Sequence, residues 1–175
     1  MNYFILLDAA RLEDEMDTAK SLNPFFDLLY RGQSEETLAS VAPYIFQNKQ
    51  GSEFDRWYFE KGWGGSWCVL LYSQEDMKAL HKHFRRFLMV KTEDGEELYF
   101  RFYDPRVLRI FLPTCDKDQL KEFFGLVDYF ICEDEDPGFG LVFSLYDGLL
   151  NQERITKEAI MDFEPPAKKK RFSFF

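Results

Sequence analysis

The most constraining feature of this sequence is a strand–turn–strand pattern that precedes a short helix, between Phe84 and Cys115. The segment Phe87–Lys91 is apolar and strand-like. Glu93-Asp94-Gly95 follows it, and Asp-Gly favours tight hairpin turns because it tolerates positive φ angles. Between Leu98 and Tyr103, residues alternate with the period of two that is typical of a strand. The pattern therefore predicts a β-hairpin.

A short helix is predicted directly after this hairpin. Asp104 is suited to the N-cap, where a carboxylate accepts backbone N–H bonds, and Pro105 suits the first helical position because it has no N–H to lose. Leu108, Phe111 and Leu112 share one helical face. Pro113 is expected to end the helix.

Four charged residues gather where the second strand meets this helix, and we call them the arginine corner: Arg101, Asp104, Arg106 and Arg109. One interpretation is a structural lock, in which Asp104 caps the helix and an arginine pairs with it. The other is a site that grips a carboxylate or phosphate, since the planar guanidinium fork binds such groups bidentately. The sequence does not separate the two.

The segments HFRRFLMVKTEDG and FRFYDPRVLRIFLPTC resemble a known family, the domain of unknown function 4123. Three further motifs match that family in the same order: YFILLDAAR near the N-terminus, then SVAPYIF, then EKGWGGSWCVLL. The resemblance runs from about Tyr3 to about Ile131. It implies a bacterial type VI secretion adaptor, which chaperones a toxic effector and brings it to the spike protein of the secretion needle. Its glycine-rich motif is then a signature of the fold.

The rest of the chain predicts a mixed α/β fold, with short strands and helices in one compact domain or in two small lobes divided between Tyr72 and Phe130. We place one domain at residues 1–147 and a C-terminal helix with a tail at 148–175. Further strands are expected at Tyr3–Leu7, Phe25–Tyr30, Tyr44–Phe46, Trp67–Tyr72, Leu126–Cys132 and Gly140–Tyr146, the last two paired as an antiparallel hairpin. Further helices are expected around Leu12–Ala19, Glu35–Val41, Phe54–Tyr58, Met77–Leu88, Leu120–Phe124 and Ile155–Phe163.

Two sequence features bear on small-molecule binding. Asp8 follows the first strand before a small-residue turn, as at the start of an α/β unit, where ligand sites form at strand ends; alternatively it caps the next helix, which we favour. The backbone N–H groups of the glycine-rich loop from Gly62 to Trp67 could bind a phosphate. It leads into a strand and lacks a following Gly-Lys-Ser/Thr, so a tight turn that lets tryptophans pack closely is the better interpretation.

Composition favours a protein partner over nucleic acid. The chain holds 20 Phe, 9 Tyr and 3 Trp, and its net charge is −9. A core of this size could absorb many of these aromatic residues, and some are expected at the surface. An acidic body is a poor match for a phosphate backbone, whereas aromatic residues are enriched at protein interfaces. We therefore select Trp57, Trp63 and Trp67, together with the arginine corner, as candidate partner-binding residues.

Other patterns predict neither cofactor nor metal. Cys68, Cys115 and Cys132 lack paired spacing and are expected as free thiols. His81 and His83 point to different sides of their helix, so they cannot share a metal as an i, i+4 pair could. The acidic run from Glu133 to Asp136 lacks EF-hand spacing, which favours a solvated turn over a Ca²⁺ site. With neither a signal peptide nor an apolar run of membrane-spanning length, we expect a cytoplasmic protein.

The C-terminus ends in a basic-aromatic tail, residues 167–175, containing KKKRFSFF. It is either a frayed terminus or a docking peptide, with cations for an acidic surface and phenylalanines for pockets.

These observations favour an interaction protein over an enzyme, and the family resemblance implies that it is an adaptor that cradles a hydrophobic or basic segment of an effector. The alternatives are a small α/β enzyme or anion-binding module that uses the arginine corner with Asp8, and a nucleotide or phosphate sensor that uses the glycine-rich loop.

Overall fold

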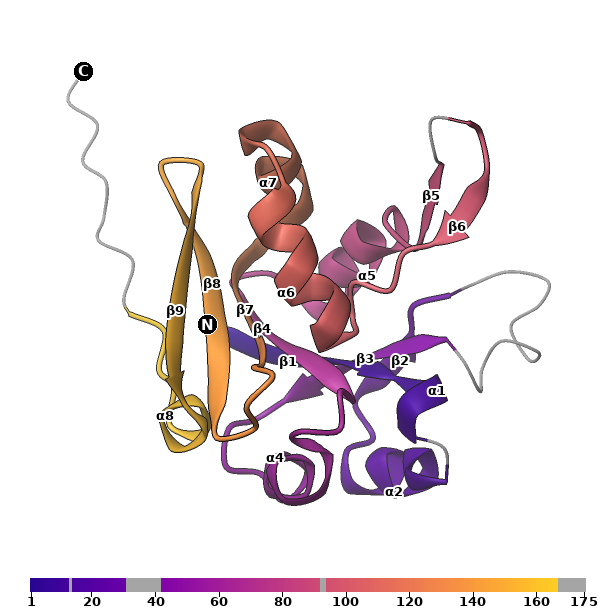
Figure 1. The fold of residues 1–175 in the computed structure, drawn as a ribbon. Coiled ribbons are helices and arrows are strands. Elements are labelled where there is room, and N and C mark those ends of the chain that lie inside the picture. The colour runs from indigo at the N-terminus through magenta and orange to yellow at the C-terminus, as the bar shows by residue number, and fades with distance from the viewer. Residues whose placement is uncertain (13, 31–41, 92–93, 167–175) are drawn as a thin grey trace.

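The computed structural model describes residues 1–12, 14–30, 42–91 and 94–166. Its centre is a seven-stranded sheet in the order β2-β3-β1-β4-β7-β8-β9, in which all neighbouring strands are antiparallel (Figure 1). The strands are β1 (Asn2–Asp8), β2 (Phe26–Leu28), β3 (Pro43–Asn48), β4 (Cys68–Ser73), β7 (Val127–Glu133), β8 (Phe139–Tyr146) and β9 (Leu149–Thr156). The mixed α/β class predicted from the sequence is confirmed.

The central strand β1 shows why the sheet has helices on both faces. Tyr3, Ile5 and Leu7 point into one core and Phe4 and Leu6 into the other, because successive side chains of a strand alternate between faces. A strand buried on both faces reads as a continuous apolar run, as this one does.

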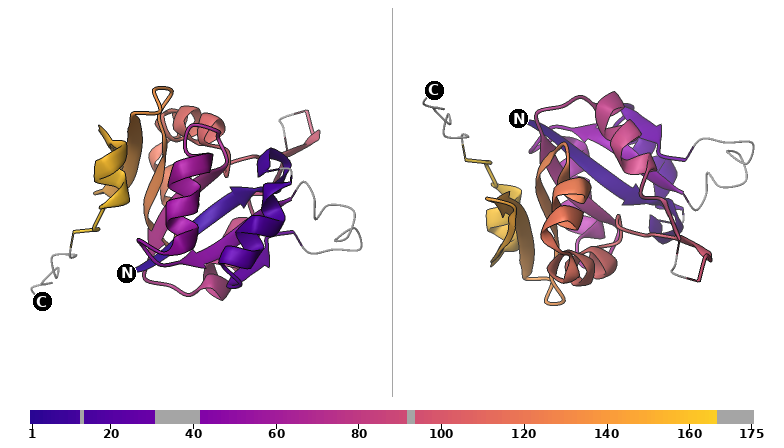
Figure 2. Two further views of the ribbon diagram at one scale, coloured as in Figure 1. Left: turned by 90° about the horizontal axis from the view of Figure 1, so that it is seen from below. Right: turned by 90° about the horizontal axis from the view of Figure 1, so that it is seen from above.

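Helices cover each face of the sheet (Figures 1 and 2). The Tyr3 face packs against α1 (Ala9–Leu12), α2 (Glu15–Leu22), α4 (Glu53–Trp57), the π-helical turn η1 (Tyr58–Gly62) and α8 (Lys157–Met161). The Phe4 face packs against α5 (Met77–Arg85), α6 (Pro105–Thr114) and α7 (Lys117–Phe124). None of the described helices is both long and apolar enough to cross a bilayer.

The predicted hairpin forms as β5 (Met89–Lys91) and β6 (Glu97–Tyr99), a separate two-stranded sheet that projects from the body beside α5 (Figure 1). Its strands are shorter than predicted. Phe100 still donates its N–H to Leu88 O at 3.0 Å, but Phe102 has left the hairpin and is fully buried in the core.

Three sequence predictions about the fold need correction. The start of an α/β unit at Asp8 is wrong, because β1 pairs antiparallel on both sides. Ile155 lies in β9 and not in the C-terminal helix, which is confined to α8. Strands β4 and β7 pair directly, so the described sheet is continuous and shows no division into two lobes between them.

The sheet also continues past the proposed boundary at residue 147. Asp147 and Gly148, both with positive φ, form the turn that joins β8 to β9. The helix predicted at Glu35–Val41 and the tail at 167–175 lie outside the described residues.

Candidate functional site

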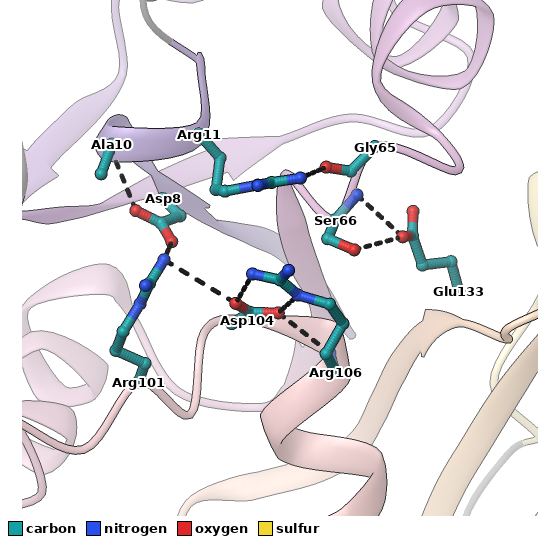
Figure 3. Close-up of polar contacts among 9 residues, drawn as sticks. All are labelled: Asp8, Ala10, Arg11, Gly65, Ser66, Arg101, Asp104, Arg106 and Glu133. Atoms are coloured by element: carbon teal, nitrogen blue, oxygen red, sulfur yellow. Dashed lines mark hydrogen bonds and ion pairs between the residues drawn. The ribbon is translucent and has the colours of Figure 1, made fainter.

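The structure brings three residues of the arginine corner together with Asp8 (Figure 3). Asp104 is the N-cap of α6 and is almost completely buried. Its Oδ1 accepts from the backbone N–H and the Nε of Arg106, both at 3.0 Å, and its Oδ2 accepts from Arg106 Nη2 at 2.6 Å. Burial raises the pKa of Asp104, but the hydrogen bonds from Arg106 and the positive charges outweigh burial and hold it below its usual value.

Arg101 links this cap to the end of the central strand. Its Nη2 donates to Oδ2 of Asp8, which is fully buried, and lies 3.7 Å from Asp104 Oδ2. The other oxygen of Asp8 accepts from Ala10 N at 3.1 Å at the start of α1, so the favoured capping role for Asp8 is confirmed. The hydrogen bond to Asp8 raises the pKa of Arg101. Two guanidinium groups are thus held by two carboxylates of the same chain.

Arg109 is not part of this cluster. Its guanidinium lies over the end of β7, with Nη1 3.5 Å from Glu133 O and Nη2 3.5 Å from Glu135 Oε1. Arg109 lies five residues after Asp104, more than one helical turn further along α6, so its guanidinium reaches the end of β7 and not the cap.

The glycine-rich loop does bind an anion, but the anion belongs to the chain. Glu133 is 2% exposed, and its Oε2 accepts from Gly64 N at 2.6 Å. Its Oε1 accepts from Ser66 N at 2.8 Å and from Ser66 Oγ at 2.9 Å (Figure 3). Gly64 and Ser66 both adopt positive φ, which turns their N–H groups toward one point, as in anion-binding nests. The carboxylate occupies the position that a phosphate sensor would need, and nothing in this geometry favours that hypothesis.

The acidic run is also more than a solvated turn. Besides the buried Glu133, Asp134 Oδ2 accepts from Arg154 Nε at 2.6 Å. Within the described ranges, no group of three or more His, Cys, Asp or Glu residues could hold a metal ion.

The tryptophans selected from the sequence lie in the core. Trp57 and Trp63 are buried and Trp67 is partly buried, and the rings of Trp57 and Trp67 are 5.6 Å apart. A Cβ atom on Gly62 would lie 2.5 Å from the ring of Trp67, which is why the loop needs glycine there. The tight-turn interpretation of the loop therefore agrees with the structure, whereas the expectation that these rings are exposed to a partner is corrected.

A group of exposed aromatic and apolar residues lies instead on the β5–β6 hairpin and on α6, and further exposed ones include Phe25, Tyr146 and Leu149. Leu98 is 49% exposed, Tyr99 60% and Ile110 67%. Val90 pairs with Leu98, and Met89 pairs with Tyr99, so both faces of the hairpin carry apolar side chains. We call Leu98, Tyr99 and Ile110, with the half-buried Phe100 and Phe111 between them, the hairpin–α6 surface.

A shallow groove joins this surface to the arginine corner, since Phe100, Ile110 and Phe111 line it together with Arg101, Asp104 and Arg106. The sequence pattern predicted the hairpin but not its exposed apolar side chains. The apolar residues on both of its faces could have indicated this exposure, because a two-stranded hairpin cannot bury both faces against one body.

The two histidines are structural. His81 Nε2 lies 2.8 Å from Leu28 O on β2, and His83 Nε2 lies 2.8 Å from Phe123 O on α7. Their opposite orientations on α5 agree with the prediction from helical spacing.

Comparison with known proteins identifies the family. The model for "Domain of unknown function (DUF4123)" matches residues 3–122, about two thirds of the chain. The chain belongs to the DUF4123 family. The match begins in β1 and ends in α7, so it includes the arginine corner, the glycine-rich loop and the hairpin–α6 surface of this DUF4123 chain. No curated protein and no solved structure matches it significantly.

Proposed function

We propose that this DUF4123 protein is an adaptor of a bacterial type VI secretion system, which binds a toxic effector and helps load it onto the spike protein. The observation that carries the proposal is the hairpin–α6 surface. It presents apolar and aromatic side chains on a projecting element, and such side chains dominate the energy of protein interfaces. The resemblance noted in the sequence motifs implies an effector and a spike protein as the partners to test.

In this proposal the arginine corner has a supporting role. Its Arg101 contacts both Asp8 at the end of β1 and Asp104 at the start of α6, which fixes α6 beside the hairpin. Arg101 and Arg106 are 40% and 47% exposed at their side chains, so they also form the polar edge of the groove. An interface with an apolar centre and a polar edge is the usual arrangement.

A small enzyme or an anion-binding module has no specific observation in its favour. Arg101 and Arg106 each already hold a carboxylate of the chain, so an incoming anion would have to compete with Asp8 or Asp104.

The first experiment is co-purification of the protein from its native host, with mass spectrometry of what it retains. A secreted toxin or a spike protein in stoichiometric amount supports the proposal. Turnover of a small molecule by the purified chain, without any such partner, would refute it.

The second experiment locates the contact. The double variant Leu98→Ser/Tyr99→Ser should weaken effector binding by tenfold or more, about the effect of losing one interface hot spot. Leu149→Ser/Phe25→Ser is a matched control, because it also removes one exposed leucine and one exposed aromatic side chain, 63% and 69% exposed, and neither residue belongs to the hairpin–α6 surface. Equal losses in both variants would contradict the assignment of the hairpin–α6 surface.

A further inference from the structure

A second groove lies at the opposite end of the sheet, on the face of Tyr3. Tyr129, Ser144 and Asn151 stand in one row across β7, β8 and β9, and Val142 and Glu153 stand in the next row. These residues line the groove together with Phe163, Pro166 and Tyr146, and we call it the C-terminal groove. At about 640 Å³, it suits a short segment with several side chains.

The chemistry of the C-terminal groove is aromatic and acidic. The rings of Tyr129 and Phe163 meet at 5.6 Å, and Tyr146 is 74% exposed. Asp128 and Glu153 are its charged lining residues, and both are negative. Glu153 accepts from Asn151 Nδ2 at 3.1 Å and forms no ion pair with any residue that the structure describes. A basic segment with aromatic side chains would complement this lining.

The chain itself supplies such a segment at the right place. It passes through the groove at Phe163 and Pro166, and nine residues, 167–175, follow. They carry four positive charges at Lys168–Arg171 and three phenylalanines. Fully extended, nine residues reach about 30 Å, enough to follow the whole length of an eight-residue strand.

We propose that the tail, residues 167–175, docks back into the C-terminal groove of its own chain, with its cations toward Asp128 and Glu153 and its phenylalanines toward Tyr129 and Tyr146. Because the tail is attached at the rim of the groove, its effective concentration there exceeds that of any separate partner at ordinary protein concentrations. The inference is independent of the adaptor proposal, since it concerns the isolated chain.

Limited trypsin digestion of the full-length protein tests the docking, because the tail contains four consecutive cleavage sites. Docking protects these sites. Glu153→Lys should speed tryptic loss of the tail about fivefold. The substitution replaces the attraction of a surface ion pair by repulsion, and the cleavage rate follows the population of the undocked state. Glu122→Lys, the same change at an exposed position of α7 on the other face of the sheet, should leave the rate unchanged. Equal rates in the two variants would overturn the proposal.

Disulfide trapping distinguishes docking within one chain from docking between chains. In a Cys115→Ser background, the pair Asn151→Cys and Phe174→Cys should form an intramolecular bond at least about tenfold faster than Glu122→Cys with Phe174→Cys. The other native thiols, Cys68 and Cys132, are fully buried. A disulfide-linked dimer would show that a second copy takes the groove. A reaction no faster than the control would show that the tail is undocked in the isolated protein, so either result overturns the proposal.

Discussion

Three buried carboxylates fix the local geometry around the candidate site. Asp8, Asp104 and Glu133 are each 2% exposed or less, and each is held by guanidinium groups or backbone N–H groups. A buried charge is tolerated only when such partners replace its hydration. The contacts of Asp8 with Arg101 and of Glu133 with Gly64 join segments far apart in the chain, whereas Asp104 caps its own helix and holds the neighbouring Arg106.

Replacing Asp104 tests the link at the start of α6. Asp104→Ala removes the N-cap and the acceptor of Arg106, and should lower the free energy of unfolding by about 1–2 kcal/mol. Arg106→Ala should have a smaller effect, about 0–1 kcal/mol, because its side chain is 47% exposed and water screens the pair. Urea denaturation measures both. An Asp104→Ala variant of unchanged stability that has lost effector binding would show that the residue contacts the partner directly.

Replacing Glu133 tests the anion nest of the glycine-rich loop. Glu133→Ala leaves the N–H groups of Gly64 and Ser66 without their acceptor, and should lower the free energy of unfolding by about 2–3 kcal/mol. Added phosphate should then raise the melting temperature of Glu133→Ala more than that of the wild type, since only the variant has a vacant nest. Equal stabilisation by phosphate in both proteins would show that the loop does not select the anion.

His83 predicts a pH dependence of stability. Burial lowers its pKa, and the charge of Arg86 lowers it further, against the opposing effect of the hydrogen bond to Phe123 O. The folded state therefore holds neutral His83, while the unfolded chain takes up a proton below about pH 6.5. The stabilising contribution is present above that pH and is lost as the pH falls below it, by at most about 1.4 kcal/mol per pH unit.

Substitution of His83 should remove this dependence. Between pH 7 and pH 5.5, the free energy of unfolding of His83→Gln should fall less steeply than that of the wild type in urea titrations. Lys78→Gln, which removes an exposed charge from the same helix, should keep the wild-type slope. Identical slopes for all three proteins would mean that His83 does not titrate differently on folding.

At the scale of elements, local chemistry predicted most helix starts and strands. Asp104 before Pro105 acts as the cap predicted for α6, because a cap depends on neighbours within one turn. Strand β9 was missed, since Asn151 to Arg154 is polar and carries no apolar alternation. Its place depends on pairing with β8 along all eight residues, which is a tertiary contact.

The candidate site was predictable only in part, for the same reason. That Asp104 and Arg106 meet follows from their spacing, but the partner of Arg101 is 93 residues away at Asp8. The acceptor in the glycine-rich loop is Glu133, 69 residues from Gly64. The tryptophans were selected as partner-binding candidates because the aromatic content of the chain is high, whereas helical layers on both faces of the sheet provide two cores, one of which holds all three.

For the whole molecule, the family match and the folded unit differ in extent. The match ends at residue 122 in α7, but the sheet continues through β7, β8 and β9. Without β7, strand β4 would become a buried edge with unpaired backbone groups. The C-terminal third is therefore part of the same cooperative structure, whatever its sequence shares with the family.

Two C-terminal truncations test this at the scale of the whole chain. Ending the chain after residue 147 removes β9 and α8, which leaves β8 as an exposed edge and removes the buried Ile160 from the core beside Trp63. Loss of one buried isoleucine side chain alone costs about 2–5 kcal/mol, a large part of the about 5–15 kcal/mol that stabilises a typical domain. Ending it after Pro166 removes only the tail, so the cooperative unfolding transition should survive with a small shift. Circular dichroism melting compares the two, and a normal transition for the shorter chain would show that residues 148–175 are a separate appendage, as the boundary drawn from the sequence implied.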